Sequence, residues 1–174
     1  RQMCIRDSYM EGLDCIGSDV RLLTALWELG VRGASLTWSR RNLLASGCCK
    51  ASECYEIRGG LSPEGFDVVR EMERLGMFVD VSHLNDDGFE NIRETAIRPF
   101  MATHSNSREV AFHYRNLTDT QMQILADQGG IAGLNGYVRL VSETAEEEYP
   151  DENGVYCLEK LCMHVAVSYT HLRA

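Results

Sequence analysis

Hydrophobic and polar residues follow two different periods along the chain. In several segments apolar residues recur every three or four positions, which is typical of helices with one buried face. Shorter segments between these helices are expected to be strands, and the compact apolar run at residues 77–81 is typical of a strand buried on both faces. The expected helices cover residues 18–29, 62–75, 85–96, 118–128 and about 155–166, and the expected strands cover residues 31–37, 77–81, 99–103 and 131–134.

Residues that begin and end helices flank several of these segments. Ser62 followed by Pro63 is an N-cap with proline at the first helical position. Thr118 and Gln121 have the spacing of a capping box, and Gly76 is suited to the left-handed residue that ends a helix. The residues expected on the buried face of the 62–75 helix are Phe66, Val69, Met72 and Leu75.

The alternation of strands and helices favours parallel βα units and an α/β fold. Right-handed crossovers of such units build either an open doubly wound sheet or part of a closed barrel. The sequence has no glycine-rich phosphate-binding motif after a strand, so a nucleotide-binding sheet lacks its usual signature. A complete (β/α)8 barrel needs about 250 residues, whereas 174 residues suffice for about half of one. Residues 38–60 are expected to form a long irregular loop.

The composition excludes several functional classes. The chain is 44% hydrophobic with a formal net charge of −9, as expected for a globular protein of ordinary solubility. No apolar run approaches the about 20 residues of a membrane-spanning helix, and no signal peptide is visible. An acidic balance without a basic stripe argues against nucleic acid or an anionic membrane surface as a partner. The seven cysteines include no CxxC pair, so a zinc ribbon or a thioredoxin-type motif has no support. Because no signal peptide is visible, we expect reduced thiols and a cytoplasmic location; a disulfide or a bound metal among Cys48, Cys49 and Cys54 is the alternative.

The two ends differ from the rest of the sequence. Residues 1–8 and 167–174 share no helical or strand period with their neighbours. Both strings look like translated sequencing-adapter read-through, and we expect neither to belong to the natural protein; genuine frayed termini are the alternative. The remaining residues, 9–166, are expected to be an internal fragment of one barrel domain.

Three residues of types that bind metals follow predicted strands. His83 lies two positions after Val81, and His104 directly follows Thr103. Adjacent parallel strands would deliver both imidazoles to the carboxyl edge of the sheet, where barrels have their active sites. Imidazoles suit zinc, and Glu11, after a short apolar lead-in, is a third candidate ligand. The alternative is that each is an ordinary polar or solvated residue.

Seven short motifs follow one another between residue 11 and about residue 166. They are Glu11-Gly12, Leu29-Gly30-Val31-Arg32 leading to Ser35-Leu36-Thr37-Trp38, Gly59-Gly60-Leu61-Ser62, Glu71-Met72-Glu73-Arg74-Leu75-Gly76-Met77, Asp80-Val81-Ser82-His83, Thr103-His104-Ser105-Asn106 and Arg115-Asn116-Leu117-Thr118-Asp119. In this order and spacing they resemble the membrane (renal) dipeptidase family of zinc peptidases, including its bacterial members. Any one motif would be weak, but seven in order are specific.

The resemblance implies a (β/α)8 TIM barrel of the metal-dependent hydrolase type, whose two-zinc site hydrolyses dipeptides by means of a metal-bound hydroxide. Glu11 matches the family's bridging carboxylate, and His83 and His104 match the two histidine ligands of one zinc. Arg115 matches the arginine that binds the substrate carboxylate. By sequence alone, a solvated Arg115 ahead of a helix is the simpler interpretation.

Departures from the family limit what this chain is expected to do. The His-x-Asp pair that holds the other zinc is not found upstream of Glu11, and a later Asp of the site is also missing. We therefore expect the 174 residues alone to be inactive and to hold at most one weakly bound zinc ion. Trp38 stands where animal members have a substrate-contacting histidine. Asp80 has the opposite strand parity to His83, so we expect it to support the site rather than bind metal.

Two other functions stay open at this point. One is a different barrel metal hydrolase, acting on lactones, phosphoesters or cyclic amides, because fold alone does not fix the substrate. The other is a metal-free, non-catalytic relative that serves as a binding module. For the dipeptidase itself the expected partner is a small dipeptide substrate, and a homodimer is an open alternative.

Overall fold

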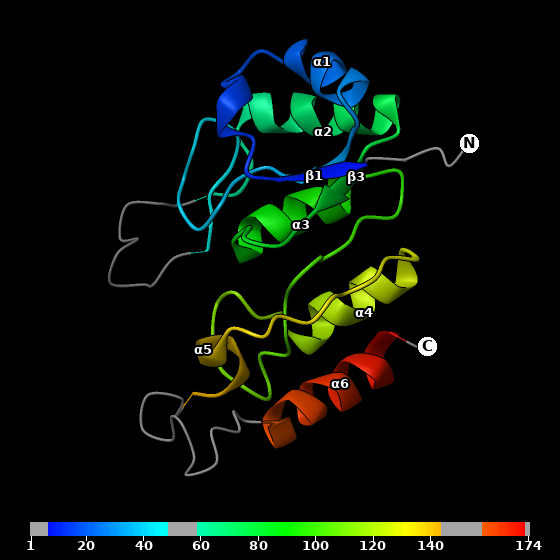
Figure 1. Cartoon of the computed structure of the whole chain (residues 1–174). Coiled ribbons are helices and arrows are strands. Elements are labelled where there is room, and N and C mark those ends of the chain that lie inside the picture. The colour runs from blue at the N-terminus through cyan, green and yellow to red at the C-terminus, as the bar shows by residue number, and fades with distance from the viewer. Residues whose placement is uncertain (1–6, 49–58, 144–157, 173–174) are drawn as a thin grey trace, which may run out of the picture. The chain divides into compact units, whose positions relative to one another are not determined.

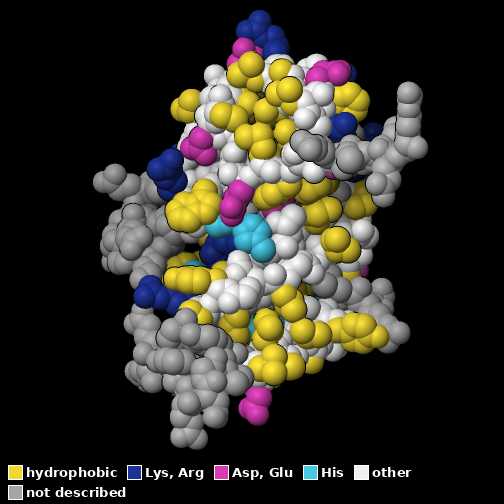
Figure 2. Space-filling model, viewed as in Figure 1, with side chains coloured by type: hydrophobic (Ala, Val, Ile, Leu, Met, Phe, Trp, Pro, Cys, Tyr) yellow, Lys and Arg dark blue, Asp and Glu magenta, His cyan; other side chains and the backbone are white. Residues whose placement is uncertain are grey.

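The structure is a computed structural model that describes residues 7–48, 59–143 and 158–172. The chain divides into two units, Arg1–Arg98 and Pro99–Ala174. Within the described ranges, no helix combines the length and the apolar character needed to cross a membrane. On the visible face the Lys and Arg side chains stand at separate places, without a basic stripe (Figure 2).

The first unit is built on a parallel three-stranded sheet with the strand order β1-β2-β3. The sheet lies between the helices of this unit (Figure 1). Helices connect its consecutive strands, which confirms the predicted βα alternation. The apolar residues before Glu11 indicated a strand, and β1 confirms it. The elements are β1 (Ser8–Glu11), the 3-10 helix η1 (Asp14–Ile16), α1 (Leu22–Glu28), β2 (Val31–Ser35), α2 (Pro63–Leu75), β3 (Phe78–Asp80) and α3 (Asp86–Thr95).

A glycine in the middle strand lets two aromatic rings meet across it. Tyr9 of β1 and Phe78 of β3 are both in register with Gly33 of β2. Their rings stack with centroids 5.9 Å apart and planes 1° apart. A Cβ atom on Gly33 would lie 2.2 Å from Cζ of Phe78, so a larger residue cannot occupy this position without displacing the ring.

The helix ends follow the sequence signals, whereas the buried face of α2 differs in part. The hydroxyl of Ser62 accepts a hydrogen bond from the N–H of Gly65, and Gly76 ends the helix with a φ of 78°. Val69 and Met72 are buried as predicted. The other two predicted residues, Phe66 and Leu75, are only half-buried. The buried face of the helix is rotated toward Val68 and Glu73 instead.

The second unit contains α4 (Asp119–Asp127), α5 (Val138–Val141) and α6 (Leu158–Leu172). The hydroxyl of Thr118 accepts from the N–H of Gln121, and the Gln121 side chain accepts from the N–H of Thr118, which confirms the capping box. The predicted strands 99–103 and 131–134 are wrong as full strands. They form a single parallel bridge, Ala102 with Ala132. Ile131, at the start of the second segment, is 63% exposed.

The loop expected over residues 38–60 is irregular where the structure describes it, with isolated antiparallel bridges from Ala45 to Leu61 and from Gly47 to Leu84. Residues 49–58 lie outside the described residues, and so does the predicted start of the last helix at 155–157. At the two ends, β1 begins at Ser8 and α6 continues to Leu172. The two elements thus extend into the segments 1–8 and 167–174, and the foreign origin of these segments stays a prediction.

Candidate metal and substrate site

Glu11 is the last residue of β1, and its position is fixed by the turn that follows. Gly12 has a φ of 84°, a left-handed conformation that glycine adopts without strain. The N–H of Gly12 donates to the hydroxyl of Ser35 at the end of β2. The Glu11 side chain is 43% exposed, so its carboxylate stands at the carboxyl edge of the sheet within reach of solvent.

His83 follows β3 and has the one positive φ found for a non-glycine residue in the described part of the chain, 74°. The N–H of Cys48 donates to the carbonyl of His83 over 2.7 Å, and the N–H of Leu84 donates to that of Val81. These bonds hold the backbone in a conformation that only a few per cent of such residues adopt. As a result the imidazole points to the same edge of the sheet as Glu11.

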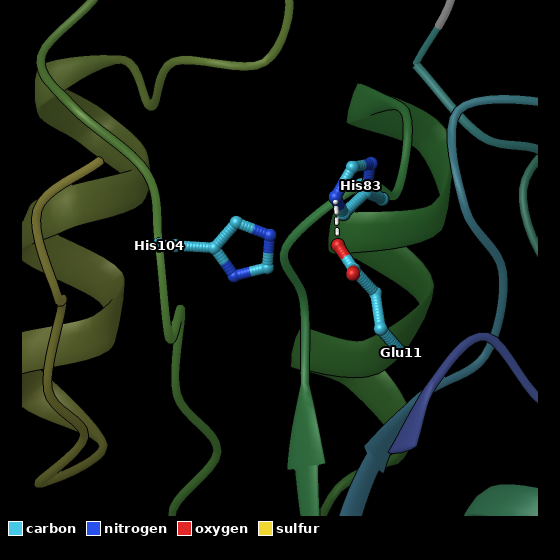
Figure 3. Close-up of side chains that lie close together, drawn as sticks. All are labelled: Glu11, His83 and His104. Carbon is cyan, nitrogen blue, oxygen red and sulfur yellow. Dashed lines mark ion pairs between the residues drawn. The ribbon is translucent and has the colours of Figure 1, made fainter. Parts of the chain in front are cut away.

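Glu11 and His83 form a close pair within the first unit (Figure 3). Oε1 of Glu11 lies 2.7 Å from Nε2 of His83. The His83 side chain is only 7% exposed, so one side of the pair is closed to water and the other is open through Glu11. The sequence argument from strand ends was made for the two histidines, with Glu11 as a third candidate, and the structure places Glu11 directly against His83.

Two residues of the loop after β2 surround the His83 ring. The hydroxyl of Ser39 lies 2.9 Å from Nδ1 of His83, which is the ring nitrogen that faces away from Glu11. The ring of Trp38 stacks on the imidazole with centroids 5.6 Å apart, although 54% of Trp38 stays exposed. Sequence reasoning missed Ser39, because no local pattern reports a contact between residues 44 positions apart.

Asp80 stabilises the backbone around the Glu11–His83 pair through hydrogen bonds, in line with the supporting role expected from its strand parity. Its side chain is fully buried in β3. Oδ2 accepts from the hydroxyl of Tyr9 over 2.5 Å, and Oδ1 accepts from the N–H of Ser82 over 2.8 Å. The carboxylate therefore links β1, which carries Glu11, to the residue that precedes His83.

The other two predicted site residues, His104 and Arg115, both belong to the second unit. The Thr103 hydroxyl lies 2.7 Å from Nδ1 of His104. The Arg115 guanidinium donates to the Ser105 hydroxyl over 3.0 Å and to the His104 carbonyl over 2.9 Å. Arg115 is only 7% exposed, so the simpler interpretation of a solvated arginine is wrong. Its guanidinium is oriented by the segment that carries His104.

The residues of the Glu11–His83 pair suit a metal ion. A carboxylate oxygen and an imidazole nitrogen lie 2.7 Å apart, and both are ligand types that zinc takes in proteins. One residue of the pair is buried and the other is partly exposed. Catalytic zinc sites likewise keep one coordination position open to water or substrate. The ring nitrogen that does not face the carboxylate has a hydroxyl partner, as ligating histidines do in metal sites.

A second group of metal-binding residue types, Glu109, Asp119 and His171, lies in the second unit. A side-chain hydrogen bond with Asp119, and the repulsion between the two like charges, raise the pKa of Glu109. Nε2 of His171 lies 3.4 Å from Oδ2 of Asp119. His171 lies in the terminal segment 167–174, so we base no function on this group.

Comparison with known proteins gives the family. The sequence model of the membrane dipeptidase family (peptidase family M19) matches residues 8–165. The chain belongs to this family. Among relatives, it is 33% identical over 129 residues to an uncharacterized protein from the pqqA 5′ region of Klebsiella pneumoniae, covering 74% of this chain and 48% of the relative. It is also 33% identical to the dipeptidase tcpJ of Claviceps purpurea, covering 79% of this chain and 32% of that protein.

A solved structure supports the same assignment. The metallopeptidase of Rhodobacter sphaeroides, solved with a phosphinate mimic of the dipeptide L-Ala-D-Ala, superposes with a TM-score of 0.84 at 29% identity. The match covers 95% of this chain and 46% of that chain. Metallopeptidases of this family are TIM barrels, so the predicted partial (β/α)8 barrel is confirmed. The chain thus spans about a third to a half of the length of these relatives.

Proposed function

We propose that the protein carrying this sequence is a metal-dependent dipeptidase, which hydrolyses the peptide bond of small dipeptides. Membership of the membrane dipeptidase family supports this activity, as do the dipeptidase of Claviceps purpurea and the Rhodobacter sphaeroides metallopeptidase with its dipeptide mimic. Because the chain spans only about a third to a half of the length of such relatives, we expect the activity to require the full-length protein.

In this proposal Glu11, His83 and His104 hold a zinc ion. The contact between the Glu11 carboxylate and Nε2 of His83 is the observation that carries it. The place of His104 directly after the 99–103 segment, with its Nδ1 against a hydroxyl, supports its role as the third ligand. Bound zinc supplies Lewis acidity, which polarises a carbonyl and lowers the pKa of water.

The protein side chains have two further tasks. The exposed Glu11 carboxylate faces solvent, where it is able to accept a proton from an incoming water. Arg115 is proposed to bind the substrate carboxylate, for which a planar guanidinium offers a two-pronged hydrogen bond. Its bonds to Ser105 and His104 support this role, because an arginine fixed by its own chain loses little entropy on binding.

Zinc titration of the 174-residue chain tests the ligand assignment. We expect at most one zinc ion per chain, with the affinity lowered by at least about a hundredfold in Glu11→Gln and in His83→Gln, since even supporting residues contribute 10–100-fold. Glu28→Gln, which alters an exposed glutamate of α1, is the matched control and should bind zinc as the original chain does. Equal affinity in all four proteins would contradict the assignment.

The activity itself is tested on the full-length protein. After removal of metal with a chelator and return of Zn²⁺, hydrolysis of L-Ala-L-Ala and L-Ala-D-Ala is followed by release of alanine. We expect activity only in the zinc-loaded protein, and its loss in His83→Gln but not in Glu28→Gln. A zinc-loaded protein that hydrolyses neither dipeptide, while cleaving a lactone or a phosphoester, would replace this proposal with another hydrolase.

A further inference from the structure

The His83 ring is held at both of its nitrogens, which constrains where its proton resides. Nε2 lies 2.7 Å from Oε1 of Glu11, and Nδ1 lies 2.9 Å from the hydroxyl of Ser39. Trp38 stacks on one face of the same ring. With both nitrogens and one face in contact, the ring has little freedom to turn. A change in the protonation of one nitrogen therefore requires a change in the hydrogen bond of the other.

Neutral imidazole has one N–H donor and one acceptor nitrogen, whereas an ionised carboxylate only accepts. While Nε2 of His83 faces Glu11, the proton of the neutral ring is on Nε2. Nδ1 is then the acceptor, and the Ser39 hydroxyl donates to it. When Nε2 binds a metal ion through its lone pair, the ring proton has to be on Nδ1, and the Ser39 hydroxyl has to accept.

We propose that Ser39 is the positioning residue of His83, and that its hydroxyl reverses its hydrogen bond when Nε2 exchanges a proton for a metal ion. The proton count of the ring does not change, because Nε2 loses a proton to water and Nδ1 takes one from water. A carbonyl or carboxylate beside Nδ1 would only accept a hydrogen bond. It would therefore suit only the metal-bound state, in which Nδ1 carries the proton. This inference rests on the proposed role of His83 as a ligand.

The second unit repeats the arrangement independently. The hydroxyl of Thr103 lies 2.7 Å from Nδ1 of His104. Thr103 directly precedes His104 in the chain, whereas Ser39 and His83 are 44 positions apart. Two different local structures thus put a hydroxyl, able both to donate and to accept, on the same ring nitrogen of each proposed ligand.

Imidazole nitrogen NMR on the whole chain tests the reversal. With ¹⁵N-labelled histidine, a protonated and an unprotonated ring nitrogen have well-separated shifts, and the signals absent from His83→Gln assign the ring. We expect the proton of His83 on Nε2 without metal and on Nδ1 after addition of Zn²⁺. A zinc-free chain with the proton already on Nδ1 would overturn the inference.

Zinc titrations of Ser39 variants test the positioning role. Ser39→Ala should weaken zinc binding by about tenfold to a hundredfold, as for other residues that orient ligands. Ser39→Thr keeps the hydroxyl and should restore the affinity, and Ser18→Ala, an exposed serine of the same unit, should not change it. Circular dichroism confirms that each variant folds.

The outcomes separate this inference from the proposed function. If zinc moves the His83 nitrogen signals but Ser39→Ala binds zinc as tightly as the original chain, only the role of Ser39 is refuted. If zinc leaves the His83 nitrogen signals unchanged, both the ligand assignment and the inference fail. A shifted proton together with a weakened Ser39→Ala and a restored Ser39→Thr supports both.

Discussion

The Asp80 carboxylate is the buried group on which the geometry of the site depends most directly. It accepts from the Tyr9 hydroxyl over 2.5 Å and from the Ser82 N–H over 2.8 Å, so it connects the first and third strands below the Glu11–His83 pair. Replacing it by alanine removes both acceptors at once. We expect a loss of stability of the first unit and a weaker hold on His83.

The magnitude follows from the surroundings of the two donors. Ser82 is 1% exposed, so its N–H has no access to water after the change, and an unsatisfied buried donor costs about 1–3 kcal/mol. Tyr9 is 36% exposed, so its hydroxyl turns to water and loses only about 0.5–1.5 kcal/mol. We therefore expect Asp80→Ala to cost about 2–4 kcal/mol. Asp80→Asn keeps an acceptor for Ser82 and should cost about 1 kcal/mol.

Urea unfolding followed by tryptophan fluorescence reports on the unit that contains Asp80. The chain's two tryptophans, Trp27 and Trp38, both lie in this first unit. The control is a double-mutant cycle with Tyr9→Phe, which removes the hydroxyl alone. In the Asp80→Ala background the Tyr9→Phe change should cost almost nothing. A cost of Asp80→Ala below about 0.5 kcal/mol, or an unchanged effect of Tyr9→Phe, would refute this reasoning.

Two further predictions concern packing and pH. Gly33→Ala should cost about 1–3 kcal/mol in the same urea assay, since its Cβ would lie 2.2 Å from the Phe78 ring; a neutral result would contradict the stacking. Burial lowers the pKa of His164, whose neutral ring accepts from the Ser107 N–H and donates to the Val141 carbonyl. The unfolded state then binds the proton more readily, so the second unit should lose stability as pH falls below about 6.5. Thermal unfolding at pH 7.5 and 5.5 checks this, and an equal pH dependence in His164→Gln would contradict it.

The sequence predicted those features that depend on neighbouring residues. The capping box at Thr118 and the N-cap at Ser62 form as expected, because each needs only contacts within one helical turn. The pairing of Glu11 with His83 was also predictable, since parallel strands end at one edge of a sheet. The two helix caps share a cause, because each follows from backbone geometry that a short segment determines by itself. The Glu11–His83 pair depends instead on the parallel pairing of three strands.

The features that the sequence could not predict depend on distant partners. The apolar run 99–103 indicates burial, but whether it pairs along its length depends on residues 131–134, and only Ala102 and Ala132 form a bridge. The burial of Arg115 depends on its bonds to Ser105 and to the carbonyl of His104, which no residue type reveals. Amphipathic spacing likewise placed the face of α2 only approximately.

The backbone of His83 connects the fold to the proposed chemistry. A positive φ at a residue other than glycine costs of order 1–2 kcal/mol, and here it is opposed by the bond from the Cys48 N–H and by the support of Ser82 through Asp80. Glycine would adopt this conformation without strain but would offer no imidazole. The strained conformation turns the ring between Glu11 and Ser39, which is the orientation that a ligand requires. Strain that is held by several contacts and serves to aim one side chain is characteristic of a functional site rather than of a structural turn.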